Sequence, residues 1–282
     1  MGSSLETIAK VICAEYNMSY VKKVGEGSFK ETFKVYSNEG IVGALKVFKA
    51  SNSAERSSRE IDAMLRCDHP NIGKIRFMDN YNYNGKNNLF TIEEFFSGGT
   101  LGEHLKKNGD LSKKDTVRLG LLLIDAIKHI ASKDLVHRDI KPENVMFSTD
   151  ISHPVIVDFG LVRDLSNKSL TQTWLMSGPG TPFYSAPEQL NNEKNLIDWR
   201  TDQYALGVLL SLSLFGIHPY AKQGDNMAQV VIRVARRDSV NSDFKQAVKN
   251  NGVSPLSKMV KQWPVERYRN IEELYHEWEK VE

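Results

Sequence analysis

The sequence predicts an α+β fold in which a small antiparallel β-sheet with one main helix precedes a larger, mostly helical part. In the first third of the chain, short runs rich in β-branched and aromatic residues are bounded by glycine or asparagine, as is typical of strands. These runs cover residues 20–27, 31–37, 43–50 and 88–95. After Leu101 the apolar residues recur at helical spacing instead.

The expected helices differ in how their apolar residues are distributed. Residues 54–67 form the one helical pattern among the strands. Residues 116–132 and 201–215 are apolar on all sides, which predicts deeply buried helices. Residues 270–282 are amphipathic around Leu274 and Trp278.

Turn signals define the expected boundaries. Asn84-Gly85 predicts the turn of a β-hairpin. The FFSGG segment, residues 95–99, has the composition of a hinge. We expect an N-terminal extension at 1–19, the sheet-rich part at 20–94 and the helical part at 95–282, with about 20–275 forming a single domain.

Composition excludes several classes of protein. The 282 residues are 40% hydrophobic, and the net charge is only +2, so neither nucleic acid nor an anionic membrane is an expected partner. The most apolar stretch, residues 204–216, is shorter than the roughly 20 residues of a membrane span. The two cysteines do not have the spacing of metal ligands, and the first residues do not have the order of regions found in a secretory signal. Both observations favour a reducing, cytoplasmic setting. No pattern indicates an oligomeric state.

The stretch VGEGSFKETFKV, residues 24–35, places Gly25 and Gly27 between two strand-like runs. Glycines there let the backbone approach a phosphate without a Cβ in the way. A plain hairpin loop is the alternative. Further on, Lys46 lies in an apolar strand and Glu60 in the following helix. If Lys46 faces inward, Glu60 is its natural partner; a surface salt bridge is the other interpretation.

The stretch HRDIKPEN, residues 137–144, brings Asp139, Lys141 and Asn144 close together. The apolar run PVIVDFG follows and ends in Asp158 before a Phe-Gly turn. Carboxylate and amide oxygens such as those of Asp158 and Asn144 are ligands that Mg²⁺ accepts. Asp139 can accept or orient a hydroxyl proton, and Lys141 can neutralise charge on a phosphoryl group.

Two later segments, GTPFYSAPE at 180–188 and DQYALG at 202–207, complete an ordered set. With the glycine loop, the strand lysine, HRD and DFG, they make the chain resemble a eukaryotic-type serine/threonine protein kinase from about residue 20 to 275. The resemblance implies the bilobal protein kinase fold. It also implies transfer of the γ-phosphate of ATP, with Mg²⁺ as cofactor, to Ser/Thr hydroxyls of a protein substrate.

The resemblance also assigns roles to residues. Lys46, held by Glu60, would contact the α- and β-phosphates, and Asp139 would be the catalytic aspartate, assisted by Lys141. Asn144 and Asp158 would hold Mg²⁺. The other ATP-binding positions would be Val24, Gly25, Gly27 and Thr32 around the nucleotide and the backbone of Glu94 and Phe96 at the adenine.

Regulation and internal bracing are implied in the same way. Arg138 would grip a phosphorylated activation loop, with Thr171 and Thr173 as the first candidates for autophosphorylation; a loop ordered without phosphate is the alternative. Thr181 would contact the catalytic aspartate and the substrate site. The expected bracing contacts are Glu188 with Arg267, Asp202 with the backbone of the HRD loop, and His137 in an internal apolar stack with Met64 and Phe159.

Two charged residues, Lys30 and Glu93, stand at positions where the family pattern has other residues. Lys30 replaces the third loop glycine. It would be either a surface lysine or an auxiliary phosphate contact, and the GSFK order is similar to that of the with-no-lysine kinases, which use a loop lysine. Glu93 stands where an apolar residue is usual, so if buried it needs a partner or a raised pKa.

The sequence fits two other classes of protein less well. A pseudokinase acting as a binding module usually lacks the strand lysine, the HRD aspartate or the DFG aspartate, and all three are present here. A small-molecule kinase of the aminoglycoside type would lack the GTPFYSAPE segment.

Overall fold

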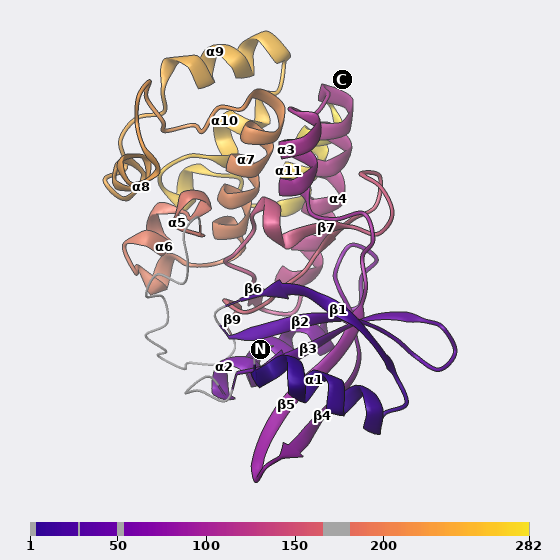
Figure 1. Ribbon diagram of the computed structural model, residues 1–282. Coiled ribbons are helices and arrows are strands. Elements are labelled where there is room, and N and C mark those ends of the chain that lie inside the picture. The colour runs from indigo at the N-terminus through magenta and orange to yellow at the C-terminus, as the bar shows by residue number, and fades with distance from the viewer. Residues whose placement is uncertain (1–3, 28, 50–53, 166–180, 282) are drawn as a thin grey trace. The chain divides into compact units, whose positions relative to one another are not determined.

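The computed structural model describes residues 4–27, 29–49, 54–165 and 181–281 (Figure 1). The chain divides into two compact units, one of residues 1–68 and 73–97 and one of residues 69–72 and 98–282. The first holds an antiparallel sheet and the second is mostly helical, so the predicted α+β fold is confirmed.

The sheet unit has five strands in the order β1-β2-β3-β5-β4, each antiparallel to its neighbour. The strands are β1 (Ser19–Glu26), β2 (Lys30–Tyr36), β3 (Val42–Phe48), β4 (Ile75–Tyr83) and β5 (Lys86–Glu94). The predicted hairpin turn joins β4 to β5, and Asn84 and Gly85 both have positive φ, as a type I′ turn requires. The sequence did not predict β4, because its mostly exposed residues show no buried alternation.

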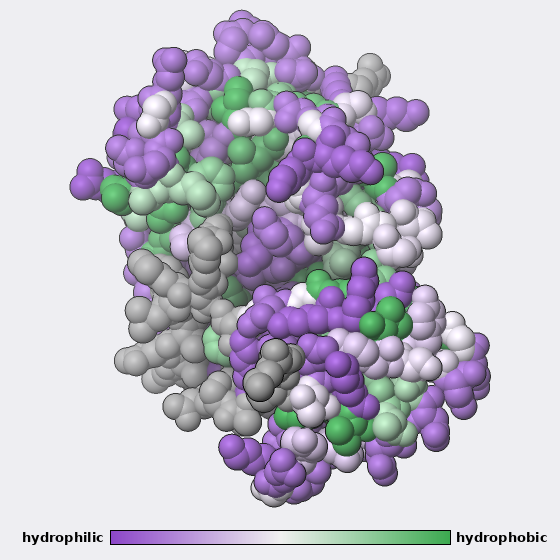
Figure 2. All heavy atoms as spheres, viewed as in Figure 1, coloured by the Kyte–Doolittle hydropathy of each residue, from purple (hydrophilic) through white to green (hydrophobic). Residues whose placement is uncertain are grey.

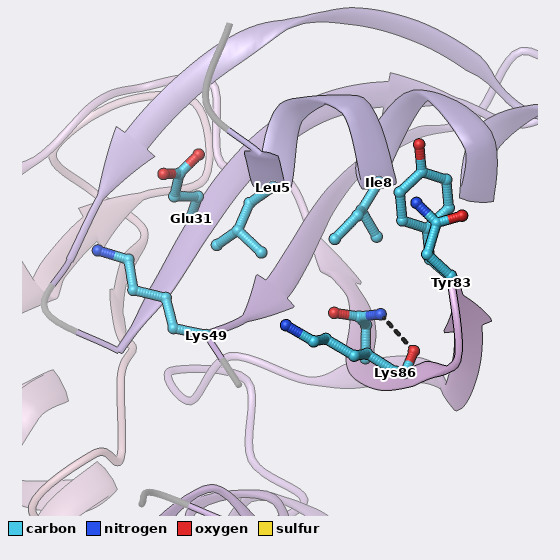
Figure 3. Close-up of a pocket in the computed structure, with 8 residues that line it drawn as sticks. Leu5, Ile8, Glu31, Lys49, Tyr83 and Lys86 are labelled. Atoms are coloured by element: carbon cyan, nitrogen blue, oxygen red, sulfur yellow. Dashed lines mark hydrogen bonds between the residues drawn. The ribbon is translucent and has the colours of Figure 1, made fainter. Parts of the chain in front are cut away.

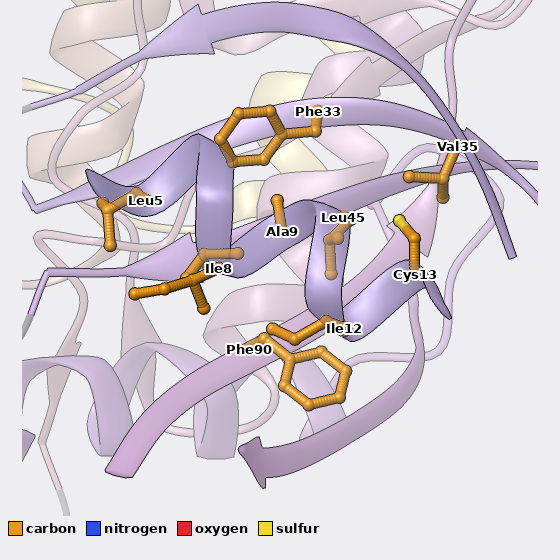
Figure 4. Packing of buried hydrophobic residues seen from close by; sticks show 10 residues of the cluster. Leu5, Ile8, Ala9, Ile12, Cys13, Phe33, Val35, Leu45 and Phe90 are labelled. Atoms are coloured by element: carbon orange, nitrogen blue, oxygen red, sulfur yellow. The ribbon is translucent and has the colours of Figure 1, made fainter. Parts of the chain in front are cut away.

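Alternation along the strands gives the sheet two different faces. Phe33, Leu45 and Phe90 share one face and are fully buried. Helix α1 (Ser4–Glu15) covers this face with Leu5, Ile8, Ala9, Ile12 and Cys13 (Figure 4). The stretch expected only as an N-terminal extension therefore contributes a helix to the core of the sheet unit.

Helix α2 (Ala54–Arg66) contacts the other face of the sheet. Its Glu60 forms an ion pair with Lys30 of β2, whose side chain alternates with those that meet α1. The two helices therefore lie on opposite faces.

A pocket of about 400 Å³ opens beside α1 (Figure 3). Leu5, Ile8, Glu31 and Lys49 line one part of it, and Tyr83, Asn84, Lys86 and Asn88 of the β4–β5 hairpin line the rest. None of these residues is a predicted site residue, so the pocket is separate from the predicted chemistry.

The helical unit contains nine α-helices within the described residues. They are α3 (Leu101–Asn108), α4 (Lys113–Ala131), α5 (Thr181–Tyr184), α6 (Pro187–Leu190), α7 (Trp199–Phe215), α8 (Met227–Ala235), α9 (Ser242–Asn251), α10 (Pro255–Met259) and α11 (Ile271–Glu279). Its strands are β6 (Leu135–Val136), β7 (Val145–Phe147), β8 (Pro154–Ile156) and β9 (Arg163–Asp164), and its 3₁₀ turns are η1 (Pro142–Asn144), η2 (Lys194–Leu196) and η3 (Pro264–Glu266). β6 pairs with β9 and β7 with β8.

Helices α4 and α7 form the centre of this unit, and α11 packs on α4. The fully buried indole of Trp278 donates a hydrogen bond to the Val117 carbonyl at 2.9 Å. Gly120 leaves room for that ring, since an added Cβ would overlap it. The predicted helices at 116–132, 201–215 and 270–282 are present, with ends shifted by a few residues.

Hydrophilic residues predominate on the face shown in Figure 2, and hydrophobic ones form smaller groups. Across the described ranges, we find no helix with the length and apolarity needed to span a bilayer.

Candidate active site

The glycine loop is the turn between β1 and β2. Gly25 pairs with Thr32, and the Gly27 N–H donates to the Lys30 carbonyl at 2.8 Å. An added Cβ would meet its nearest atom at 3.7 Å at Gly25 and at 3.6 Å at Gly27, and neither residue has a left-handed φ. The turn itself could therefore accommodate alanine at both positions, so its geometry does not explain the two glycines.

In the sheet unit, Lys30 and Lys46 have ion-pair partners that differ from the predicted ones. Glu60 was expected to hold Lys46, but its ion pair is with Lys30. Lys46 donates instead to Glu93 Oε2 at 2.6 Å. Lys30 is only 8% exposed, so the interpretation of it as a surface lysine is also wrong.

Glu93 has the partners that its burial requires. Besides Lys46, the Thr91 hydroxyl donates to its other carboxylate oxygen at 2.9 Å. The strand register explains why Lys46 and Glu93 come together: Lys46 lies directly opposite Thr91 and diagonal to Glu93 on the same face of the sheet. The strand pattern could have revealed this: Lys46 and Glu93 lie on adjacent strands and share a face.

The remaining predicted nucleotide positions lie along the same sheet. Thr32 is directly opposite Lys46 and is half-buried, whereas Val24 is 42% exposed. At the end of β5 the Glu94 N–H donates to the Lys74 carbonyl at 3.2 Å. Phe96 is buried.

In the helical unit, the HRD loop is tied to α7 by one carboxylate. Asp202 accepts from the His137 N–H at 2.8 Å and from the Arg138 N–H at 2.7 Å. Arg138 has φ +68°, an uncommon value for a residue with a side chain, and these two bonds hold it there. Burial raises the pKa of Asp202 to about 7 against the effect of the two bonds. The expected bracing role of Asp202 is confirmed.

Asp139, Lys141 and Asn144 form one hydrogen-bonded cluster. Lys141 Nζ donates to both Asp139 oxygens, at 3.1 and 2.9 Å. Asn144 Nδ2 donates to Asp139 Oδ2 and to its backbone carbonyl, both at 2.9 Å. Burial raises the pKa of Asp139 to about 6, and the charge and hydrogen bonds of Lys141 oppose that shift. The carboxylate is thus anchored and ready to accept a proton near neutral pH.

The β7–β8 hairpin brings Asp158 to this cluster. Val145 pairs with Ile156, and the Val157 N–H donates to the Asn144 carbonyl at 2.9 Å, so Asn144 and Asp158 lie at the same end. Asp158 has φ +69°. Because the Asn144 amide nitrogen is committed to Asp139, the amide oxygen is the atom it can offer a cation. One carboxylate and one amide oxygen suit Mg²⁺, which completes its shell with phosphates and water.

No group of three or more His, Cys, Asp or Glu side chains capable of holding a metal occurs among the residues described. A site that shares its metal with a nucleotide needs no such group, because phosphate oxygens and water supply the remaining ligands.

His137 is a structural residue. It is fully buried, its Nδ1 accepts from the Asp139 N–H at 3.2 Å, and Nε2 lies 3.3 Å from the Val157 carbonyl. Its ring meets Phe159 edge-on, with centroids 4.7 Å apart. Burial lowers the pKa of His137 to about 4, so the imidazole is neutral and orients the loop rather than moving protons.

The APE segment, residues 186–188, is held by contacts with other residues of the helical unit. Arg267 donates to Glu188 through Nη1 at 2.7 Å and Nη2 at 2.9 Å, as expected. Thr201 adds a hydroxyl donor to Glu188 at 2.9 Å. Gln189, which the sequence analysis did not single out, donates to the Arg138 carbonyl at 2.8 Å and so links the APE segment to the HRD loop.

The expected phosphorylation positions Thr171 and Thr173 lie outside the described residues. Thr181 begins helix α5, but its side chain also lies outside the described part of the chain.

Comparison with known proteins shows which family the chain belongs to. The protein kinase domain model matches residues 18–279. The chain belongs to the protein kinase family. The resemblance inferred from its motifs is thereby confirmed, and the sheet unit and helical unit are those of a kinase domain.

Among its relatives, this kinase domain is 30% identical to "Calcium-dependent protein kinase 5" of Plasmodium falciparum (isolate 3D7), over 92% of this chain and 44% of that protein. It is 26% identical to "Probable serine/threonine-protein kinase PknB" of Lactococcus lactis, over 95% of this chain and 42% of that protein. It is 29% identical to "Serine/threonine-protein kinase AtPK1/AtPK6" of Arabidopsis thaliana, over 76% of this chain and 45% of that protein. The chain thus spans less than half the length of these relatives.

Proposed function

We propose that this chain is an active serine/threonine protein kinase that transfers the γ-phosphate of ATP to hydroxyl groups of a protein substrate. The observation that carries the proposal is the Asp139 cluster, in which a buried carboxylate is held by Lys141 and Asn144 at hydrogen-bond distance. The serine/threonine names of the curated relatives support the choice of acceptor.

Each residue of the cluster has a role in this reaction. Asp139 orients the acceptor hydroxyl and takes its proton, while Lys141 stabilises charge on the phosphoryl group in flight. Asn144 and Asp158 would hold Mg²⁺. The metal, when bound, neutralises phosphate charge. Catalysis would thus come mainly from positioning and from fixed charge.

The two loop glycines support ATP as the phosphate donor. The turn tolerates a Cβ at Gly25 and at Gly27, so its own geometry does not require glycine. A need for close approach of a ligand to the backbone explains them instead. We propose that this loop covers the phosphates, with Val24 and Thr32 beside the nucleotide and the backbone of Glu94 and Phe96 at the adenine.

Regulation and setting complete the proposal. We include autophosphorylation at Thr171 or Thr173, with Arg138 as the phosphate partner and Thr181 at the substrate site. A cytoplasmic setting is supported by two buried cysteines, Cys13 and Cys67, which form no disulfide. The physiological substrate would be a protein recognised by this domain or by a partner.

The test is incubation of the purified chain with radiolabelled ATP, Mg²⁺ and a general protein substrate, beside Asp139→Asn. We expect label in the wild type alone, on Ser or Thr residues located by mass spectrometry. If neither protein incorporates label while ATP still binds, the proposal of catalytic activity fails and a nucleotide-binding pseudokinase replaces it.

A further inference from the structure

The pocket beside α1 lies on the face of the sheet that this helix covers. Glu31 is two residues before Phe33, and Asn88 is two before Phe90, so by strand alternation each lining residue shares the face of a buried ring. Thr32, a predicted nucleotide position, projects from the opposite face. A ligand in this pocket would therefore leave the predicted nucleotide site free.

The pocket has the size and the walls of a small-molecule site. Its volume of about 400 Å³ lies within the range of roughly 300–1,000 Å³ that is common for such sites. Leu5 and Ile8 form an apolar wall, and Figure 3 shows them pointing from α1 toward Lys49 and Lys86. An apolar body with an anionic group at one end would match these walls.

Asn88 is a buried polar side chain in the wall of the pocket, and only 4% of it is exposed. Its Nδ2 donates to the Lys86 carbonyl at 2.8 Å and to the Tyr81 carbonyl at 3.3 Å, which fixes the orientation of the amide. Its Oδ1 accepts no hydrogen bond from the residues that the structure describes. A buried acceptor without a donor is unfavourable, so this atom favours a ligand that brings an N–H or O–H group.

The charges at the pocket favour an anion. Lys49 and Lys86 line it together with one carboxylate, that of Glu31, which already has Lys23 as an ion-pair partner at 3.2 Å. The ammonium group of Lys86 has no ion-pair partner within the described ranges of the chain. An anionic ligand can therefore pair with Lys86 without breaking an existing ion pair.

Lys49 connects the pocket with the glycine loop. Its Nζ donates to the Gly27 carbonyl at 2.9 Å and lies 3.6 Å from Glu26 Oε1. Its backbone N–H donates to the Phe29 carbonyl at 2.8 Å. Lys49 thus holds both sides of the β1–β2 turn. An anion in the pocket would compete for its ammonium group and loosen the turn.

We propose that this pocket binds a small organic acid with an apolar body and an N–H or O–H donor, and that this binding lowers the affinity for nucleotide through Lys49. Lys86 pairs with the acid group, Asn88 Oδ1 accepts from the donor, and Leu5 and Ile8 contact the apolar body. The effect on nucleotide rests on the proposed kinase function, whereas the pocket as a binding site does not.

Indolepropionate is the probe for the site, because it combines a carboxylate, an aromatic body and one N–H donor. Calorimetry measures its affinity, and amide chemical shifts of isotope-labelled protein locate it. We expect a Kd of about 1 mM or lower, ordinary for a ligand of this size, with shifts at Leu5, Ile8 and Asn88. Absence of shifts at a concentration about tenfold above that Kd would overturn the site.

Two matched probes separate the contacts of the acid from those of the donor. Indolepropionamide lacks the charge, and N-methylindolepropionate lacks the N–H donor. Each should bind about three- to tenfold more weakly than indolepropionate, the scale of losing one hydrogen bond. Equal affinity of the acid and its amide would contradict an anion site.

Variants of the lining residues test the same contacts from the protein. Lys86→Gln should weaken indolepropionate about three- to fivefold, the scale of an exposed ion pair, and leave the affinity for ADP unchanged. Lys22→Gln, at an exposed lysine of β1 that does not line the pocket, is the control and should change neither affinity. Asn88→Leu should abolish the preference for indolepropionate over its N-methyl form, with thermal unfolding as a check of folding. If that variant does not fold, the N-methyl probe on the wild type still tests the contact.

The coupling is measured as the affinity for ADP with Mg²⁺, with and without saturating indolepropionate. We expect the probe to weaken ADP binding about fivefold in the wild type, a modest coupling, and to have no effect in Lys49→Gln. An effect that persists in Lys49→Gln would mean direct competition at the nucleotide site and would overturn the proposal. If the wild type does not bind ADP at all, the proposed kinase function fails, while the shifts at Leu5 and Ile8 still decide whether the pocket is a site.

Discussion

Arg267 and Glu188 form a two-point ion pair from which solvent is excluded: both side chains have 0% exposure, and Nη1–Oε1 and Nη2–Oε2 measure 2.7 and 2.9 Å. Parallel hydrogen bonds between a planar guanidinium and a carboxylate fix orientation as well as distance. The pair therefore holds α6 against the segment that follows α10.

Removing one member should destabilise the domain strongly. Glu188→Gln keeps the side-chain volume but leaves the Arg267 charge buried and unpaired, at a cost of about 3–5 kcal/mol. Urea unfolding should show a lower midpoint with an unchanged slope. Glu273→Gln, which breaks the exposed pair with Lys258, is the matched control and should change little. Equal midpoints for the two variants would mean that the buried pair adds no stability.

Asp139→Asn should separate chemistry from binding. The amide keeps the shape of the carboxylate but cannot take a proton, so we expect kcat to fall about 10²–10⁴-fold. Because Asp139 is not a predicted nucleotide contact, the affinity for ADP should stay near that of the wild type. Steady-state kinetics and calorimetry on the same preparation measure both. A loss of affinity as large as the loss of kcat would instead indicate a structural role.

The pH profile should show an acid limb near 6. Burial raises the pKa of Asp139 to about 6, so the group is protonated, and unable to accept a proton, below that pH. Activity should thus fall as pH decreases through about 6. His137 adds no limb there, because its pKa is lowered to about 4. The measurement is kcat/KM from pH 5 to 8; a profile that stays flat down to pH 5, as an aspartate with an ordinary pKa near 4 would give, would contradict it.

The part of the candidate site that lies in the helical unit was predictable, because its residues are close in sequence. Asp139, Lys141 and Asn144 span six positions, and one hairpin adds Asp158. The ion-pair partners of Lys30 and Lys46 were not predictable. The order of the motifs identifies one strand lysine, but it does not say which carboxylate that lysine pairs with. Two carboxylates, Glu60 of α2 and Glu93 of β5, are possible partners for the lysines of the sheet, and the strand register gives Glu93 to Lys46.

Helix α1 was missed for a different reason. Its apolar residues Leu5, Ile8 and Ile12 have helical spacing, but the family pattern begins only after them. A search for periodicity alone would have found the helix. The face of the sheet that it covers could be read only from the alternation of Phe33 and Leu45 once the strands were paired.

Truncating the α1 contact should destabilise the sheet unit. Ile12 is fully buried against the sheet with Phe90 (Figure 4), and Ile12→Ala removes apolar atoms and leaves a cavity. The expected loss is about 2–5 kcal/mol, measured by urea unfolding. Ala14→Ser, on the exposed side of α1, is the control and should have little effect. Unfolding of Ile12→Ala at the wild-type midpoint would mean that α1 is not part of the cooperative core.

Alanine at Gly27 should weaken nucleotide binding without unfolding the domain. An added Cβ would lie 3.6 Å from its nearest atom, the Lys30 carbonyl oxygen, which is ordinary contact, so the β1–β2 turn can form as before. The methyl group would instead stand between the backbone and a phosphate. We expect the midpoint of thermal unfolding to stay within about 1 °C of the wild-type midpoint, as for a neutral surface substitution. The KM for ATP should rise several-fold. Gly40→Ala, in the β2–β3 turn at φ +78°, is the opposite control: it should lower stability through backbone strain and leave KM unchanged. If Gly27→Ala lowered stability and left KM unaltered, the glycine would serve the turn and not the ligand.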